Sequence, residues 1–176
     1  MRWLVQAGYL RPGDIAIHGV QVDDEDIALL KQRGCHVVLC PRSNAQLGVG
    51  LPPVEKYLAA GMLPALGTDS LASAPSLSIW DEIAFAADKF GDKVPRSAWL
   101  RMATQGGAAA LGLDKQIGAL KEGYDASFQV VSLSQELSLK ALPKRSALID
   151  TLCAPHARPV VHCLYLKQHQ VYLNQD

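Results

Sequence analysis

The sequence predicts an α/β fold in which parallel strands alternate with helices and a small antiparallel β layer follows. Residues 14–112 alternate short apolar stretches with amphipathic ones, a pattern typical of β-α-β units with right-handed crossovers. Two of the apolar stretches end at residues that can do chemistry, His18 and Asp69. Such strand ends open onto one face of a parallel sheet, the active face of a β/α barrel. At 176 residues the chain is too short for a whole eight-stranded barrel, which needs about 250 residues.

The first predicted strand covers residues 14–18. It leads into a helix for which Asp23 is the N-cap and Gly34 the end. The second strand, residues 36–40, has a Val-Val-Leu centre that is apolar on both faces, as a buried parallel strand requires. These two strands and the helix between them form the first β-α-β unit.

A loop is expected over residues 41–52. It is longer than most connections between a strand and a helix, and such loops carry function more often than shorter ones. The third strand is predicted at residues 63–67, directly before Asp69. The remaining helices of this region are expected at residues 53–60, from the N-cap Ser78 to Phe90, at 95–103 and at 105–111.

After Gly112 the sequence changes to glycine turns and short apolar stretches, which predict an antiparallel β layer. A strand is expected near residues 126–131, and a hairpin from residues 159–166 and 170–173. Residues 134–154 are expected to be mostly loop with a helical turn. We therefore divide the chain into a partial β/α barrel, residues 1–113, and a small β layer, residues 114–176.

Composition excludes several function classes. Lys plus Arg (17) balances Asp plus Glu (17), so no nucleic-acid partner is expected. No uncharged stretch approaches the ~20 residues that span a bilayer, so no membrane partner is expected either. The four cysteines form no CxxC pair and lie in apolar contexts. We expect them to be reduced and buried, and the protein to be cytoplasmic.

Five motifs occur in order and together resemble the C-terminal half of the amidohydrolase superfamily. They are His18-Gly19-Val20, Cys40-Pro41-Arg42-Ser43-Asn44, Gly67-Thr68-Asp69-Ser70-Leu71-Ala72-Ser73, residues 103–113 (ATQGGAAALGL) and residues 118–126 (GALKEGYDA). The resemblance is to the branch of metal-dependent deaminases and chlorohydrolases. It implies strands 6–8 of a (β/α)8 TIM-type barrel with their helices, and part of a small β-sandwich.

The resemblance assigns the chemistry to two residues. Asp69, at the end of the eighth strand, would bind the metal and act as general base on the hydrolytic water. His18, at the end of the sixth strand, would lie beside that water. The residue types suit these roles, because a carboxylate near a divalent cation can take a proton from water and a neutral imidazole can orient or relay it. The implied cofactor is a divalent metal, zinc or iron.

Other residues of the motifs are expected around the pocket. Ser43 and Asn44 would brace it, and Arg42 would reach either a substrate or a structural carboxylate. Scaffolding of the loop remains an equal alternative for these three. Ser70 and Ser73 would hydrogen-bond the catalytic carboxylate or line the substrate pocket.

The sequence also departs from the family. The family's His-x-His pair is absent, and only 17 residues precede His18, where a metal histidine and a glutamate would have to lie. We therefore expect a homo-oligomer or a missing N-terminal half, and little metal affinity or activity for the chain alone.

The resemblance predicts hydrolysis of a C–N bond, the deamination of a nucleoside-like or heterocyclic substrate such as an adenosine derivative. Two alternatives stay open. One is an inactive half-barrel that serves only as a structural or oligomerisation module, and the other is a hydrolytic dechlorinase of a heterocycle.

Overall fold

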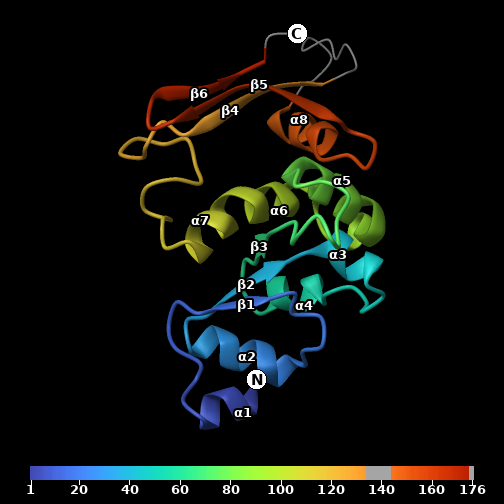
Figure 1. Cartoon of the computed structure of the whole chain (residues 1–176), viewed down its shortest axis with the longest axis vertical. Coiled ribbons are helices and arrows are strands. Elements are labelled where there is room, and N and C mark those ends of the chain that lie inside the picture. Colours follow the sequence, from blue (N-terminus) through green and yellow to red (C-terminus); the bar gives the residue numbers. More distant parts are fainter. Residues whose placement is uncertain (134–143, 175–176) are drawn as a thin grey trace.

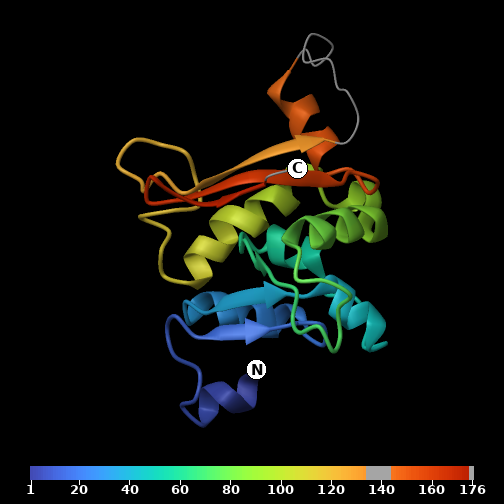
Figure 2. The same cartoon turned by 45° about the horizontal axis from the view of Figure 1, so that its top comes forward.

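The computed structural model describes residues 1–133 and 144–174 of the chain. Two three-stranded sheets lie on either side of a layer of helices (Figures 1 and 2). The elements are α1 (Arg2–Gln6), β1 (Ile15–Ile17), α2 (Asp24–Gln32), β2 (His36–Leu39), α3 (Pro41–Gln46), α4 (Val54–Ala59), β3 (Ala65–Leu66), α5 (Ile79–Phe90), the 3₁₀ turn η1 (Gly91–Lys93), α6 (Arg96–Arg101), the π turn η2 (Met102–Gly106), α7 (Gly107–Ala110), β4 (Phe128–Leu133), α8 (Arg145–Leu152), β5 (Pro159–Leu166) and β6 (His169–Leu173).

The first sheet is parallel, with its strands in the sequential order β1-β2-β3. The parallel α/β arrangement expected from the sequence is therefore present. The strands are shorter than expected, and β1 ends at Ile17 because the next residue, His18, has a φ of 70°. Among the residues that the structure describes, β1 and β3 each pair only with β2, so both outer edges of the sheet are unpaired.

The two faces of this sheet differ. Val37 and Leu39 of β2 are buried in the core, and Ala16 of β1 packs against it. Because alternate residues point to opposite faces, Ile15 and Ile17 point the other way, and they are 43% and 60% exposed. Helices thus cover one face of the sheet and leave apolar side chains open on the other.

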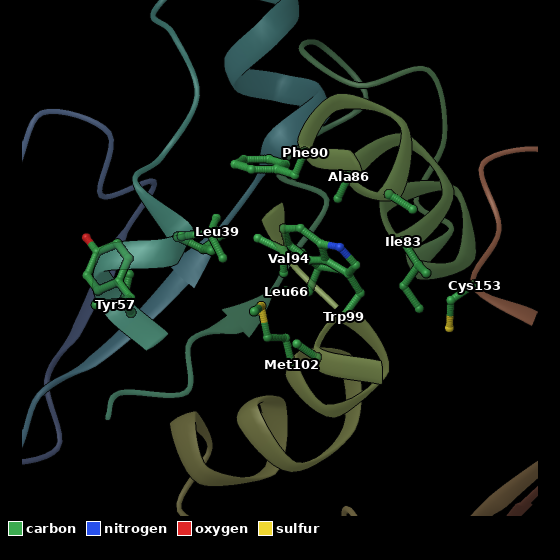
Figure 3. Close-up of a cluster of buried hydrophobic side chains, with 14 of the residues drawn as sticks. Leu39, Tyr57, Leu66, Ile83, Ala86, Phe90, Val94, Trp99, Met102 and Cys153 are labelled. Atoms are coloured by element: carbon green, nitrogen blue, oxygen red, sulfur yellow. The ribbon is translucent and has the colours of Figure 1, made fainter. Parts of the chain in front are cut away.

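The core lies between the parallel sheet and helices α5 and α6 (Figure 3). Leu39 and Leu66 from the strands meet Trp99 and Met102 from the helices, all of them buried. The rings of Phe90 and Trp99 pack at 5.1 Å between centroids, within the usual range for aromatic pairs. This core fixes the strands at whose ends the candidate site lies.

Two helix starts agree with the sequence predictions. Asp23 caps α2 in a capping box, accepting a hydrogen bond from the backbone N of Asp26 at 2.8 Å. Ser78 caps α5 with its hydroxyl alone, which accepts a hydrogen bond from the backbone N of Asp81. Both caps satisfy N–H groups that the first helical turn leaves without partners.

The loop predicted at residues 41–52 is wrong in its first half, where residues 41–46 form helix α3. Pro41 occupies the first helical position, where its fixed φ suits a helix and its missing N–H is not needed. The backbone N of Asn44 then donates to the carbonyl of Cys40 at 2.9 Å. The sequence did not predict this helix because its buried face is polar and gives no apolar stripe.

The two short helices predicted at residues 95–103 and 105–111 form one continuous rod, α6-η2-α7. The π turn brings Gly106 directly against the backbone before β3. A Cβ on Gly106 would lie 2.1 Å from the carbonyl oxygen of Pro64, which no real contact allows. Glycine is therefore required here for the rod to approach the sheet.

The second sheet is antiparallel, in the order β4-β5-β6, as expected. The hairpin turns at Lys167 and Gln168, both with positive φ, as a two-residue type I′ turn requires. The prediction of mostly loop over residues 134–154 is wrong for α8, whose Ile149 and Leu152 pack against the core. Residues 134–143 of that prediction lie outside the described residues.

Cys35, Cys40 and Cys153 are buried free thiols, but Cys163 in β5 is half-buried, so the expectation of four buried cysteines is wrong for that residue. Within the described ranges, no helix is both long enough and apolar enough to cross a membrane.

Candidate active site

The carboxyl ends of the three parallel strands bring the expected residues together. His18 directly follows β1, Ser43 and Asn44 lie in α3 after β2, and Asp69 follows β3. The Nε2 atom of His18 lies 3.8 Å from Oδ2 of Asp69. Both side chains are about one-third exposed, so they lie at a rim that a small molecule can reach.

His18 and Asp69 share an unusual backbone conformation. Their φ angles are 70° and 63°, in the left-handed region that residues with a side chain rarely adopt. Around His18 the backbone N of Gly19 donates to the carbonyl of Ile17 at 3.0 Å. This is the hydrogen bond of a γ-turn, and positive φ at its centre marks the rarer, strained form. Such strain at two facing residues is typical of functional sites.

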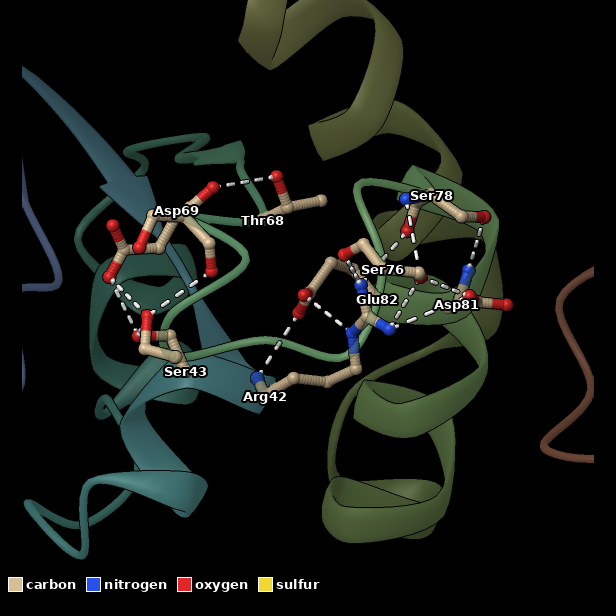
Figure 4. Close-up of polar contacts among 10 residues, drawn as sticks. Arg42, Ser43, Thr68, Asp69, Ser76, Ser78, Asp81 and Glu82 are labelled. Atoms are coloured by element: carbon tan, nitrogen blue, oxygen red, sulfur yellow. Dashed lines mark hydrogen bonds and ion pairs between the residues drawn. The ribbon is translucent and has the colours of Figure 1, made fainter.

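Two buried hydroxyls hold the Asp69 carboxylate (Figure 4). Ser43 donates to Oδ2 at 2.7 Å, and Ser73 donates to the same oxygen at 3.0 Å. The hydrogen bonds from Ser43 and then Ser73 lower the pKa of Asp69 below its ordinary value, and the nearby His18 adds to the effect. Asp69 is therefore ionised at neutral pH and fixed in orientation.

Asn44 holds the other nitrogen of the imidazole. The amide oxygen Oδ1 of Asn44 lies 2.9 Å from Nδ1 of His18. Asn44 is fully buried, and so is its neighbour Ser43. One turn of α3 thus contacts both residues to which the sequence assigned the chemistry.

Arg42 contacts a structural carboxylate, which is one of the two partners expected for it; the other was a substrate. Its Nε donates to Oε1 of Glu82 at 2.7 Å, and its backbone N donates to Oε2 at 3.2 Å (Figure 4). Its other guanidinium nitrogens donate to the hydroxyl and the carbonyl of Ser76 at 2.9 and 2.7 Å. With these bonds made, Arg42 ties α3 to α5 instead of facing a substrate.

Glu82 was missed by the sequence reasoning. It lies in α5 beside buried Ile83, where an apolar residue would be usual, and it is fully buried. Burial raises the pKa of Glu82, and the hydrogen bonds and charge of Arg42 oppose that effect. A carboxylate on the inner side of an amphipathic helix was the signal that could have revealed it.

Ser70 and Ser73 take different places. Ser73 is buried and bonds the carboxylate as expected, whereas Ser70 is exposed. The carbonyl of Ser70 accepts from the backbone N of Ala74 at 2.9 Å, which starts the turn that carries Ser73 back to the site. The backbone of Ser70, and not its hydroxyl, lowers the pKa of Asp69.

Two described groups suit a divalent cation: the Asp69 carboxylate and the Nε2 atom of His18. Carboxylate oxygen and imidazole nitrogen are ordinary ligands of zinc and iron. No set of three or more His, Cys, Asp and Glu side chains converges within residues 1–133 and 144–174. Since a catalytic metal usually has at least three protein ligands, these residues supply only part of a ligand set.

Comparisons with known proteins agree with this arrangement. The profile of the Amidohydrolase family matches residues 6–158. A 5-methylthioadenosine/S-adenosylhomocysteine deaminase from Syntrophobacter fumaroxidans is 42% identical over 134 residues, which are 73% of this chain and 31% of that protein. The chain thus spans about a third of the length of this curated relative.

Solved structures share the fold. An adenosine deaminase from Xanthomonas campestris with bound zinc superposes with a TM-score of 0.82 at 28% identity, over 98% of this chain and 40% of that one. The atrazine chlorohydrolase from Arthrobacter aurescens, complexed with zinc, gives a TM-score of 0.81 at 21% identity over 98% and 39%. At that identity, the second likeness concerns the fold alone.

Proposed function

This chain belongs to the amidohydrolase family, and we propose that it forms the C-terminal part of a metal-dependent hydrolase that deaminates an adenosine-like nucleoside. The observation that carries the proposal is the ionised Asp69 carboxylate beside His18. It is held by two buried hydroxyls at the carboxyl edge of a parallel sheet. Catalytic groups of β/α barrels occupy this edge.

In this proposal β1, β2 and β3 are strands 6–8 of a (β/α)8 barrel, within residues 1–113. Two features support it: the sequential order of the parallel strands, and helices on one face of the sheet only. The exposed Ile15 and Ile17 would then face the barrel interior. The small β layer would lie within residues 114–176, and the antiparallel sheet β4-β5-β6 supports this.

Asp69 would hold the divalent metal, zinc or iron, and accept the proton of the attacking water. The cation would act as a Lewis acid and make that water acidic enough to react near neutral pH. His18 would orient the water and relay its proton. The water oxygen bonds to the ring carbon that bears the amino group, the C–N bond breaks, and the nitrogen leaves as ammonia with the relayed proton.

Among heterocyclic substrates, an adenosine derivative has the most support. The relative at 42% identity is named for 5-methylthioadenosine and S-adenosylhomocysteine, and an adenosine deaminase shares the fold at 28% identity. Dechlorination is the weaker alternative, because the chlorohydrolase likeness extends to the fold only. Arg42 is tied to Glu82, so substrate recognition would fall to other residues.

The chain alone is proposed to be inactive, in keeping with its incomplete ligand set. The remaining ligands would come from an N-terminal half, or a copy of the chain would cover the open sheet. Unpaired strand edges and exposed apolar side chains favour such association.

A chimaera tests the function. The N-terminal segment of the Syntrophobacter fumaroxidans deaminase would be joined ahead of this chain in place of its own C-terminal part. We expect stoichiometric zinc and release of ammonia from 5-methylthioadenosine, whereas the chain alone binds zinc weakly and releases none. Asp69→Asn should lower kcat/KM by about 10²–10⁴-fold, the usual range for a general base. Asp88→Asn, at an exposed position of α5, should leave it unchanged.

Each failure has its own meaning. Release of chloride from atrazine without ammonia from the nucleoside would favour the dechlorinase. A folded chimaera that holds zinc and turns over neither substrate would contradict the hydrolase assignment and favour the structural module.

A further inference from the structure

We propose that Asn44 is a positioning residue that fixes which nitrogen of His18 carries the proton. The inference concerns the tautomer of the imidazole, and it rests on the proposed function only for its catalytic meaning. It follows from the contact between Asn44 Oδ1 and His18 Nδ1, at 2.9 Å.

A neutral imidazole has one N–H and one nitrogen with a lone pair. The amide oxygen of Asn44 has no proton to give, so the contact is a hydrogen bond only when Nδ1 of His18 carries the proton. The lone pair then lies on Nε2. A neighbouring group on one ring nitrogen is the usual means by which proteins set the state of the other.

The freed nitrogen faces Asp69. Nε2 lies 3.8 Å from Oδ2, beyond hydrogen-bond distance, so the two groups do not satisfy each other. A lone pair and a carboxylate then border the same space, and both are acceptors. Such a pair suits a water that donates two hydrogen bonds or a cation, whereas an Nε2–H group would repel a cation.

Asn44 can fix the tautomer of His18 because its own position is tightly held. It is fully buried, and its backbone N is bonded to the carbonyl of Cys40 in α3. Arg42, two residues before it, fixes the start of the same helix on Glu82 through two hydrogen bonds. The amide therefore needs no reordering when a ligand arrives.

The amide nitrogen of Asn44 defines the alternative that a test of the proposal has to exclude. Nδ2 is buried and finds no hydrogen-bond partner among the described residues. Turned over, the amide would leave its oxygen at that unpartnered position and donate from Nδ2 to Nδ1 of His18, which would then be in the Nε2–H form. The observed orientation, with the oxygen on Nδ1, belongs with the Nδ1–H form, so measuring the tautomer also tests which way the amide lies.

The chain itself, labelled with ¹⁵N-histidine, allows a direct test. Long-range ¹H–¹⁵N correlation spectra at about pH 9, where an ordinary imidazole is neutral, distinguish an Nδ1–H from an Nε2–H tautomer. The chain has five histidines, and loss of one signal in His18→Asn assigns the one in question. We expect His18 to be in the Nδ1–H form.

Two variants isolate the role of Asn44. Asn44→Asp keeps an acceptor at the same place and should retain the Nδ1–H form. Asn44→Leu keeps the volume without the acceptor and should give a mixture of both tautomers. Unchanged signals of the other four histidines would show that the leucine variant is folded.

An Nε2–H form in the unaltered chain would overturn the proposal, and this measurement requires no variant to fold. Retention of a pure Nδ1–H form in Asn44→Leu would overturn it as well. Neither result touches the proposed deaminase, which depends on the chimaera. Failure of the chimaera would leave the tautomer measurement standing.

Discussion

Ser43 donates its hydroxyl hydrogen to Oδ2 of Asp69 over 2.7 Å, and this bond joins helix α3 to the segment after β3. Because Ser43 is fully buried, water cannot easily take its place. The bond stabilises the ionised carboxylate more than the protonated one, and it is the largest cause of the lowered pKa of Asp69.

Ser43→Ala should therefore raise the pKa of Asp69 toward its ordinary value of 3.8. A carboxyl-carbon NMR titration of the chain measures this directly. Ser97→Ala, on the exposed side of α6, is the matched control and should leave the titration unchanged. An unaltered pKa in Ser43→Ala would show that Ser73 alone holds the carboxylate.

The same shift predicts how stability depends on pH. A group whose pKa is lower in the folded state contributes stability that is complete above its unfolded pKa. That contribution is lost as the pH falls through the folded pKa. On acidification below about pH 4, the unaltered chain should thus lose more unfolding free energy than Ser43→Ala does. Urea unfolding at a series of pH values checks it, and parallel curves for the two proteins would contradict it.

Removal of the Glu82 charge should destabilise the fold strongly. Glu82→Gln keeps the shape of the side chain and removes the buried carboxylate of the pair, so that the guanidinium of Arg42 keeps only the more exposed Asp81, at 3.5 Å, as a charged partner. Breaking a buried ion pair in this way costs about 3–5 kcal/mol. Urea denaturation measures the loss.

The exposed ion pair between Lys56 and Asp24 provides the comparison. Lys56→Gln should change the midpoint little, because solvent screens that pair. If Lys56→Gln and Glu82→Gln lowered the unfolding free energy equally, burial would not be the reason for the strong contribution of the Arg42–Glu82 pair.

Two adjacent glycines should respond in opposite ways to alanine. Gly106→Ala places a methyl group against the carbonyl of Pro64 and should destabilise by about 1–3 kcal/mol, the range for overpacking. A Cβ on Gly107 would meet only the carbonyl oxygen of Met102, at an ordinary contact distance of 4.0 Å, and Gly107 has helical φ and ψ. Gly107→Ala should therefore stabilise by up to about 1 kcal/mol. Thermal unfolding of the two variants measures the difference. Equal melting temperatures would contradict the prediction and show that the π turn accommodates the added methyl group at position 106 without loss of stability.

The open face of the parallel sheet should make the isolated chain self-associate. Light scattering over a range of concentrations should show dimers or larger species, and Ile17→Lys should shift them toward monomer. Leu120→Lys replaces another exposed apolar residue, outside the sheet, and should have no such effect. A monodisperse monomer at high concentration would contradict the prediction.

Local signals in the sequence predicted much of this structure. Asp23 and Ser78 revealed their helices because a cap is a contact between near neighbours in the chain. The alternation of apolar and amphipathic stretches predicted the parallel strands, and the strand ends predicted that His18 and Asp69 would meet.

What the sequence could not predict depends on contacts between distant residues. Helix α3 carries no apolar stripe, because its inner face is occupied by Arg42, Ser43 and Asn44. The partners of these side chains, among them Glu82, lie 26 to 40 residues away. Helix α8 was expected only as a helical turn, but it covers eight residues, and Ile149 and Leu152 pack against the distant core.

The left-handed backbone at His18 and Asp69 has a consequence for anyone who alters the protein. Glycine at either position would relieve the backbone strain, but it would remove the imidazole, or the carboxylate together with its hydrogen bonds from Ser43 and Ser73. At these two positions, an unstrained backbone and a reactive side chain therefore exclude each other. Asparagine adopts a left-handed backbone more readily than alanine does. An asparagine variant therefore removes the reactive group with less disturbance of the backbone.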